Sequence, residues 1–141
     1  MPTISFASSK GGAGKSTSAV LLGTELAERG ATVTIIDADP NQPVIRWGKK
    51  PGRPENLTVI GAVTEETLLD TIDVAARTTT FVIVDMEGTA RLTAAQAMIR
   101  DDLVILPSNV SEPAALESRS AITLLARHAT PEPQALRPRF R

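Results

Sequence analysis

The residues best suited to chemistry in this 141-residue chain form a loop of small side chains near its start. Its sequence is Ser9-Lys10-Gly11-Gly12-Ala13-Gly14-Lys15-Ser16-Thr17. Glycines let successive backbone N–H groups curl around phosphate oxygens, because no Cβ atom is in the way. Lys15 supplies a point charge for β- and γ-phosphates, and Ser16 supplies a hydroxyl for Mg²⁺. The loop therefore predicts a binding site for a nucleoside triphosphate.

The elements on either side of the loop are those that a phosphate site requires. Thr3–Ser8 is typical of a strand, and Lys15–Arg29 has apolar residues at helical spacing and is followed by Gly30, a favoured residue just after a helix. The N-terminus of such a helix adds unsatisfied N–H donors and a partial positive charge. Thr32–Ile36 is β-branched throughout and is predicted to be a buried strand, which completes one strand–helix–strand unit.

Three aspartates follow predicted strands. Asp37 and Asp39 come after Thr32–Ile36, and Asp85 comes after Phe81–Val84. Ligands of a parallel sheet gather at the carboxyl ends of its strands, so we expect these carboxylates to lie near the phosphate loop. Asp39 precedes a proline, and an Asp-Pro pair is also a common turn former.

The remaining segments alternate in the same way. Further strands are predicted at 57–62, 81–84 and 103–106, and helices at 64–76, 92–100 and 111–127, with a helical turn near 44–47. Because most strands are continuous apolar runs, the pattern favours an α/β fold with a parallel sheet covered on both faces. We expect one domain over residues 1–141, with 129–141 as an irregular tail.

Composition excludes several classes of protein. Apolar residues make up 42% of the chain and the formal net charge is −1, so a core can form and a whole-protein basic surface for nucleic acid is excluded. The absence of cysteine excludes disulfide scaffolds, thiol nucleophiles and iron–sulfur clusters. Neither a signal peptide nor a membrane-spanning apolar run is evident, so we expect a cytoplasmic location.

The extra lysine at position 10 is the signature of the deviant Walker A motif, and with it the chain resembles the ParA/MinD family of P-loop ATPases. The resemblance also rests on Ile36–Gln42 and Val82–Gly88. It implies a three-layer P-loop NTPase fold with a mainly parallel sheet flanked by helices. It further implies that two subunits enclose two ATP molecules and that Lys10 crosses to the partner's nucleotide.

The resemblance also implies roles for the acidic residues. Asp39 would orient the attacking water, Asp37 would support Mg²⁺ through water, and Asp85 would match the Walker B aspartate. Gly88 would offer its N–H to the γ-phosphate, although Met86-Glu87 replaces the usual small residue and Pro or Ala. The predicted site is thus Lys10, Lys15 and Asp39 as catalytic residues, Lys10, Gly11, Gly12, Ala13, Gly14, Lys15, Ser16, Thr17 and Gly88 as nucleotide-binding residues, and Ser16, Asp37 and Asp85 at the metal.

The function implied is a Mg²⁺-dependent ATPase that acts as a dimerisation switch in plasmid or chromosome partition, or in positioning a DNA cargo. Hydrolysis would be slow alone, since no arginine finger is recognisable. An adaptor protein is the expected partner, and a basic tail of Arg137, Arg139 and Arg141 could contact DNA. Two alternatives remain open: a P-loop metabolic ligase, and a nucleotide-binding interaction module without turnover. The chain is shorter than family members, so we expect the C-terminal part of the fold to be absent.

Overall fold

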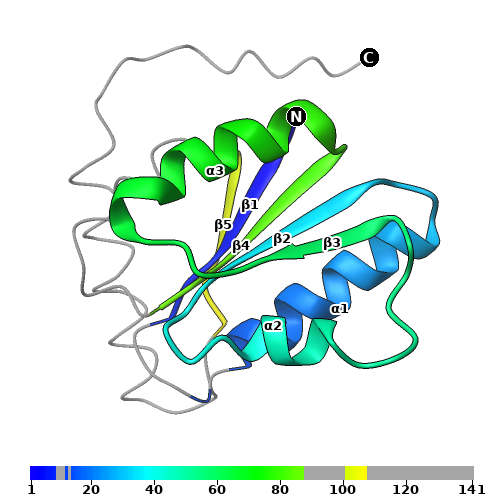
Figure 1. Ribbon diagram of the computed structural model, residues 1–141, viewed down its shortest axis with the longest axis horizontal. Coiled ribbons are helices and arrows are strands. Elements are labelled where there is room, and N and C mark those ends of the chain that lie inside the picture. The colour runs from blue at the N-terminus through cyan, green and yellow to red at the C-terminus, as the bar shows by residue number, and fades with distance from the viewer. Residues whose placement is uncertain (9–11, 13, 88–100, 108–141) are drawn as a thin grey trace, which may run out of the picture.

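The computed structural model describes residues 1–8, 12, 14–87 and 101–107. They form strands and helices that alternate along the chain (Figure 1). In chain order these are β1 (Thr3–Phe6), α1 (Lys15–Glu28), β2 (Val33–Ala38), α2 (Pro43–Gly48), β3 (Leu57–Ile60), α3 (Glu65–Thr78), β4 (Phe81–Met86) and β5 (Leu103–Ile105).

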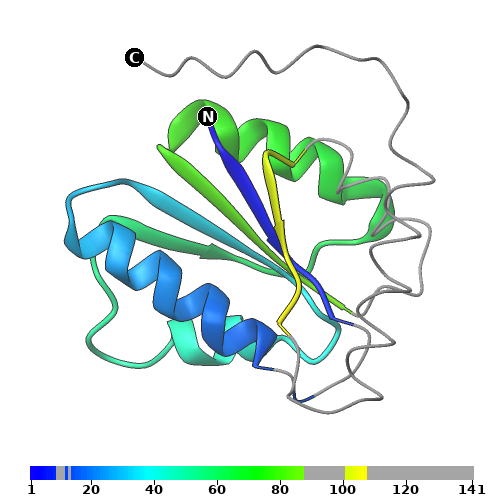
Figure 2. The ribbon, with the colours of Figure 1, turned by 180° about the vertical axis from the view of Figure 1, so that it is seen from behind.

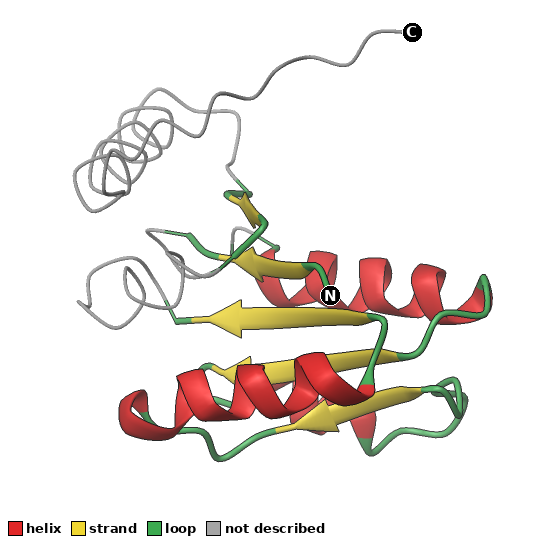
Figure 3. Cartoon of the chain, turned by 90° about the horizontal axis from the view of Figure 1, so that it is seen from above, coloured by secondary structure: helices red, strands yellow, loops and turns green. Residues whose placement is uncertain are grey.

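The strands form one five-stranded sheet in the order β3-β2-β4-β1-β5. Every pairing between neighbouring strands is parallel, and the strands run side by side in one direction (Figure 3). Helix α3 lies on one face, whereas α1 and α2 lie on the other (Figures 1 and 2). This three-layer arrangement confirms the predicted α/β fold class.

Each face of the sheet has its own hydrophobic core, because successive side chains of a strand point to opposite faces. On β2, Ile35 belongs to the core beneath α1 and Ile36 to the core beneath α3. On β4, Ile83 and Val84 divide in the same way. All four side chains are fully buried, which explains why these strands appear in the sequence as continuous apolar runs.

Two strands are longer than the sequence predicts. The apolar runs predict that β2 ends at Ile36 and β4 at Val84, but each strand continues for two more residues. The reason is that the two strands pair with one another along this extension, where Asp37 lies opposite Asp85 and Ala38 opposite Met86. The two aspartates are therefore parts of strands rather than of the loops that follow them.

Other predictions are confirmed or fall outside the described residues. The predicted turn near 44–47 is helix α2, and Thr64 caps α3 by accepting a hydrogen bond from the backbone N–H of Thr67. The predicted helices at 92–100 and 111–127 and the tail at 129–141 lie outside the described residues. Within the part of the chain that is described, no helix is both long enough and apolar enough to cross a membrane.

Helix α1 approaches the sheet closely at Gly23. A Cβ atom at this position would lie 2.7 Å from Ile35 Cδ1 and 3.4 Å from Ile83 Cδ1. Both isoleucines are fully buried, so neither can move without disturbing the core. Gly23 thus fixes the height of α1 above the sheet and, with it, the position of the phosphate loop at the start of the helix.

We predict that Gly23→Val lowers the free energy of unfolding by about 1–3 kcal/mol, because it overpacks this contact. Urea denaturation followed by circular dichroism measures the change. The matched control is Leu21→Val, which adds the same β-branched side chain to α1 at a position that is 65% exposed. Equal unfolding midpoints for the two variants would contradict the close contact.

Candidate functional site

The start of α1 is built to leave backbone donors available. Gly14, the N-cap, has a left-handed conformation with φ 80°, and no side chain caps the helix. Gly12 also has a positive φ, of 83°. The first turn contains no acidic residue, and it begins with Lys15, followed by Ser16 and Thr17. An uncapped helix N-terminus of this kind favours an anion.

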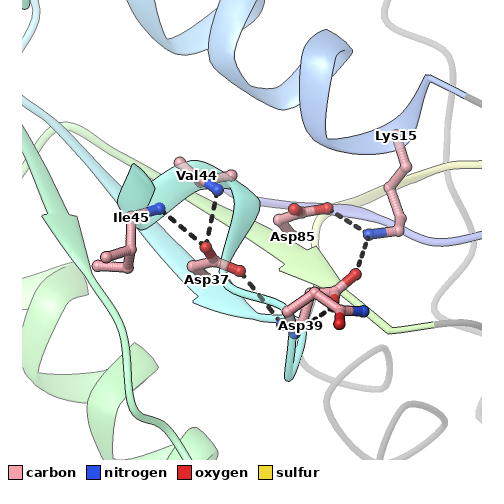
Figure 4. A network of polar contacts seen from close by, with 7 residues as sticks. Lys15, Asp37, Asp39, Val44, Ile45 and Asp85 are labelled. Carbon is pink, nitrogen blue, oxygen red and sulfur yellow. Dashed lines mark hydrogen bonds and ion pairs between the residues drawn. The ribbon is translucent and has the colours of Figure 1, made fainter. Parts of the chain in front are cut away.

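Lys15 is the central cation of the site. Its ammonium donates a hydrogen bond to Asp85 Oδ1 at 2.6 Å and lies 3.6 Å from Asp39 Oδ2 (Figure 4). The Lys15 side chain is 10% exposed, Asp39 is 17% exposed and Asp85 is fully buried. A buried ammonium is stable only when opposite charges compensate it, and here strands β2 and β4 supply them.

One oxygen of Asp85 has no partner in the described residues. Asp85 Oδ2 is buried and makes no hydrogen bond, whereas Oδ1 is occupied by Lys15. Leaving a buried carboxylate oxygen unpaired is unfavourable. The neighbouring strand places Asp37 beside it, so negative charge is concentrated here. A hard cation or its bound water suits such an oxygen, and the site therefore fits Mg²⁺.

Asp37 makes a different set of contacts. Its Oδ2 accepts hydrogen bonds from the backbone N–H groups of Val44 at 2.8 Å and Ile45 at 2.9 Å, and its Oδ1 accepts one from Asp39 at 3.2 Å (Figure 4). The carboxylate thus joins the first turn of α2 to the loop that carries Asp39. These contacts do not test the predicted support of Mg²⁺ through water, and that role stays a prediction.

Opposing influences act on the pKa of Asp37. Burial removes water from the carboxyl group and raises the pKa above its ordinary value, and the nearby charge of Asp85 acts in the same direction. The N–H donors of Ile45, Asp39 and Val44 act against this increase. The net direction is upward, chiefly because burial removes water from the carboxyl group.

Backbone N–H groups of the loop between β2 and α2 hold Asp39 in place. Asp39 Oδ1 accepts a hydrogen bond from the N–H of Asn41 at 2.8 Å, and its carbonyl oxygen accepts one from Gln42. Gln42 has a positive φ of 48°, and Pro43 then begins α2. The sequence predicts a helical turn here but not the hydrogen bonds from its first turn to Asp37. Pro43, at the first helical position, is the signal for the helix start.

The structure brings part of the predicted site together. Lys15 contacts both Asp85 and Asp39, and Asp37 lies in the same network. Ser16 and Thr17 occupy the first turn of α1, directly after Lys15. Four predicted nucleotide-binding residues lie outside the described residues: Lys10, Gly11, Ala13 and Gly88. Within the described chain, no three Asp, Glu or His side chains form a ready-made metal cluster.

A parallel sheet, a glycine-containing loop and a helix that begins at a buried lysine define a P-loop nucleotide-binding domain. Residues 4–127 match the family described as the CobQ/CobB/MinD/ParA nucleotide binding domain. This match spans most of the chain, and the chain therefore belongs to that family of nucleotide-binding domains.

Two curated relatives are similar to parts of this chain. Protein ParA of Rhizobium radiobacter is 47% identical over 107 residues, which is 76% of this chain and 48% of that protein. Protein virC1 of the same organism is 47% identical over 47 residues, or 33% of this chain and 20% of that protein. The chain thus spans about half of the length of the ParA relative and a fifth of virC1.

Solved structures share the fold at low sequence identity. The septum site-determining protein MinD of Pyrococcus horikoshii, complexed with Mg-ADP, has a TM-score of 0.75 at 21% identity, covering 91% of this chain and 66% of that one. A plasmid partition protein of Borrelia burgdorferi, bound to AMPPNP, has a TM-score of 0.67 at 18% identity, covering 89% and 70%. These likenesses confirm the P-loop NTPase fold.

We predict that Asp37→Asn loosens α2. An asparagine keeps one acceptor oxygen and replaces the other with an NH2 donor, so either the N–H groups of Val44 and Ile45 or that of Asp39 lose their acceptor. The free energy of unfolding should therefore fall by about 1–3 kcal/mol. Trp47 reports on α2 directly, because it is the single tryptophan and packs against the core beneath that helix. Its fluorescence emission should shift to longer wavelength in the variant before global unfolding.

The control is Glu66→Gln, which makes the same carboxylate-to-amide change at an exposed position of α3. It should leave the emission maximum unchanged and lower the free energy of unfolding by less than about 1 kcal/mol, because Glu66 lies in the first turn of α3. If Asp37→Asn behaves like Glu66→Gln, the carboxylate of Asp37 does not hold α2.

Proposed function

We propose that this chain is the nucleotide-binding unit of a ParA-type ATPase. In this proposal ATP drives dimerisation, and slow hydrolysis to ADP and phosphate releases the subunits. The switch would serve plasmid or chromosome partition, or the positioning of another DNA cargo, with an adaptor protein as partner and nonspecific DNA as a further one. The observation that carries the proposal is the buried Lys15 ammonium between Asp85 and Asp39 at the uncapped start of α1.

The chemistry assigned to Lys15 follows from its surroundings. Without nucleotide, the carboxylates of Asp85 and Asp39 compensate its charge. A triphosphate held at the start of α1 would present phosphate oxygens to the same ammonium, and they would replace carboxylates as its partners. The phosphate oxygens would then compensate the ammonium, and the Mg²⁺ proposed at this site would compensate the buried carboxylate of Asp85.

The predicted metal residues fit the same picture. Ser16 follows Lys15 in the first turn of α1, and the unpartnered Oδ2 of Asp85 can accept from a metal-bound water. Asp37 would assist through water from the next strand. Bound Mg²⁺ would neutralise charge on the β- and γ-phosphates, and it keeps several waters in such sites. The lack of a complete protein cluster for a metal in the described residues is compatible with this arrangement.

Asp39 is the proposed water-positioning residue. The N–H of Gln42 bonds to its carbonyl oxygen and the N–H of Asn41 to its carboxylate, whose other oxygen lies 3.6 Å from the Lys15 ammonium. In the proposed reaction, the water oxygen bonds to the γ-phosphorus and the bond to the bridging oxygen breaks, with its electron pair going to ADP. One proton of the water is released to solvent, which leaves ADP and phosphate. Asp39 would hold a hydrogen of the attacking water, while Lys10 and Lys15 would offset charge on the phosphoryl group.

We predict that two substitutions separate binding from turnover. Lys15→Ala should weaken ATP binding about 100-fold, since it removes a charged hydrogen-bond donor to the phosphates. Asp39→Ala should bind ATP normally and slow hydrolysis about 100-fold or more. Calorimetry measures the affinity, and phosphate release measures the turnover.

Lys50→Ala, at an exposed position, is the matched control for the lost lysine. Circular dichroism shows whether Lys15→Ala still folds, because that change leaves Asp85 without its cation. Normal hydrolysis by Asp39→Ala would exclude the assigned role of Asp39. Tight ATP binding with no turnover in the unsubstituted chain and an added adaptor would favour the interaction module instead.

We predict that Lys10→Ala weakens ATP-induced dimerisation without abolishing ATP binding by the monomer. The reason is that Lys10 is proposed to contact the nucleotide of the partner subunit rather than its own. Light scattering with MgATP measures the dimer, and Lys50→Ala again controls for loss of a positive charge. An unchanged proportion of dimer would refute the bridging role.

A further inference from the structure

A groove lies on the face of the sheet that α3 covers, and α1 covers the other face (Figure 1). It has a volume of about 630 Å³ and runs between α3 and strands β2 and β3. Thr34, Thr58 and Ile60 form its floor, and Asp70, Thr71 and Val74 lie on its α3 wall. A volume of this size suits a ligand or a short peptide segment.

The lining of the groove combines apolar side chains with threonines. Ile60 lies on its floor, and Val74, on its α3 wall, is 62% exposed. The hydroxyls of Thr71 and Thr78 donate hydrogen bonds to backbone carbonyls of α3. The groove is therefore a mainly apolar surface that an extended segment can cover.

Charge gives the groove a preference for cations. Glu55 and Asp70 are both exposed and line it, and no lysine, arginine or histidine does so among the described residues. Neither carboxylate takes part in an ion pair there. A segment with lysine or arginine side chains would therefore be complementary to this face.

Positive charge gathers on α2, which packs against β3, and on the loop that follows it. Helix α2 ends against β3, where a Cβ atom on Gly48 would lie 3.1 Å from Val59 Cγ2. The end of α2 and the loop that follows contain four exposed cations and no acidic side chain before Glu55: Arg46, Lys49, Lys50 and Arg53. These side chains form no ion pair within the described chain.

Strand β3 lies between these two charged surfaces and has an open edge. In the described part of the chain it pairs only with β2, and it ends the sheet on that side (Figure 1). The N–H of Leu57 already donates to the carbonyl oxygen of Pro54, and the backbone groups further along β3 that do not face β2 are those that an added strand can use. Side chains of an added strand would point alternately to the two faces.

The geometry points to the edge of β3 as a docking site for an extended segment of a partner protein. That segment carries lysine or arginine at alternate positions, which face Glu55 and Asp70, and acidic residues between them, which face the cations after α2. Backbone pairing gives the affinity, and the alternation of charge sets the register. Binding at this edge does not require nucleotide, so it can be tested separately from ATPase activity.

The probe is a fluorescein-labelled octapeptide in which lysine alternates with glutamate, titrated into the nucleotide-free chain and followed by fluorescence anisotropy. We expect saturable binding below about 1 mM. A peptide of the same composition in the order Lys-Lys-Glu-Glu, repeated, should bind at least fivefold more weakly, because it cannot separate its charges between the faces. A third peptide, alternating but N-methylated at every second residue, should also lose binding, because it cannot pair with a strand edge.

Asp70→Asn and Glu55→Gln should each weaken binding of the alternating peptide about two- to fivefold, whereas Glu66→Gln, on α3 outside the groove, should not. Amide NMR shifts on peptide addition should concentrate on β3 and α3. Equal binding of the alternating and block peptides, or unchanged binding by the N-methylated peptide, would overturn the strand-addition site. Absence of binding at 1 mM would overturn it as well.

Discussion

The interaction on which the site depends is the buried ion pair between Lys15 and Asp85, with its 2.6 Å hydrogen bond. A lone ammonium or carboxylate at this depth would be strongly unfavourable, so each charge requires the other. The pair forms only when α1 begins at the right height above the sheet and β4 lies beside β1. Close packing of α1 at Gly23 and the parallel pairing of β1 with β4 impose both conditions.

The same pair connects the fold to the chemistry. Lys15 also approaches Asp39, and Asp37 binds the backbone of Asp39 and the first turn of α2. A change of partner at Lys15 can therefore be felt by α2 through a chain of direct contacts rather than through a general loosening of the domain. This gives the proposed nucleotide switch a physical route from the phosphate loop to a surface helix.

Much of the fold could be predicted, because continuous apolar strands alternating with amphipathic helices leave few arrangements other than a covered parallel sheet. Lys15 could be predicted from the glycine-rich motif between the first strand and the first helix, and Asp37, Asp39 and Asp85 from their places at the ends of apolar runs. The extent of β2 and β4 could not, since Asp37 and Asp85 are poor strand residues that are held by pairing with each other's strand. Likewise, the bonds from Val44 and Ile45 to Asp37 are backbone contacts that no side-chain pattern reveals. The groove beside α3 depends on tertiary packing and leaves no sequence signal.

The central claim is that the lysine held between carboxylates is the phosphate ligand of a Mg²⁺–nucleotide site. The most direct measurement is isothermal titration of the folded, nucleotide-free chain with ATP in the presence and absence of Mg²⁺. The account predicts saturable binding of one nucleotide per chain that is tighter with Mg²⁺ than without it. A folded chain that releases no heat of binding with ATP and Mg²⁺, even at millimolar nucleotide, would contradict it.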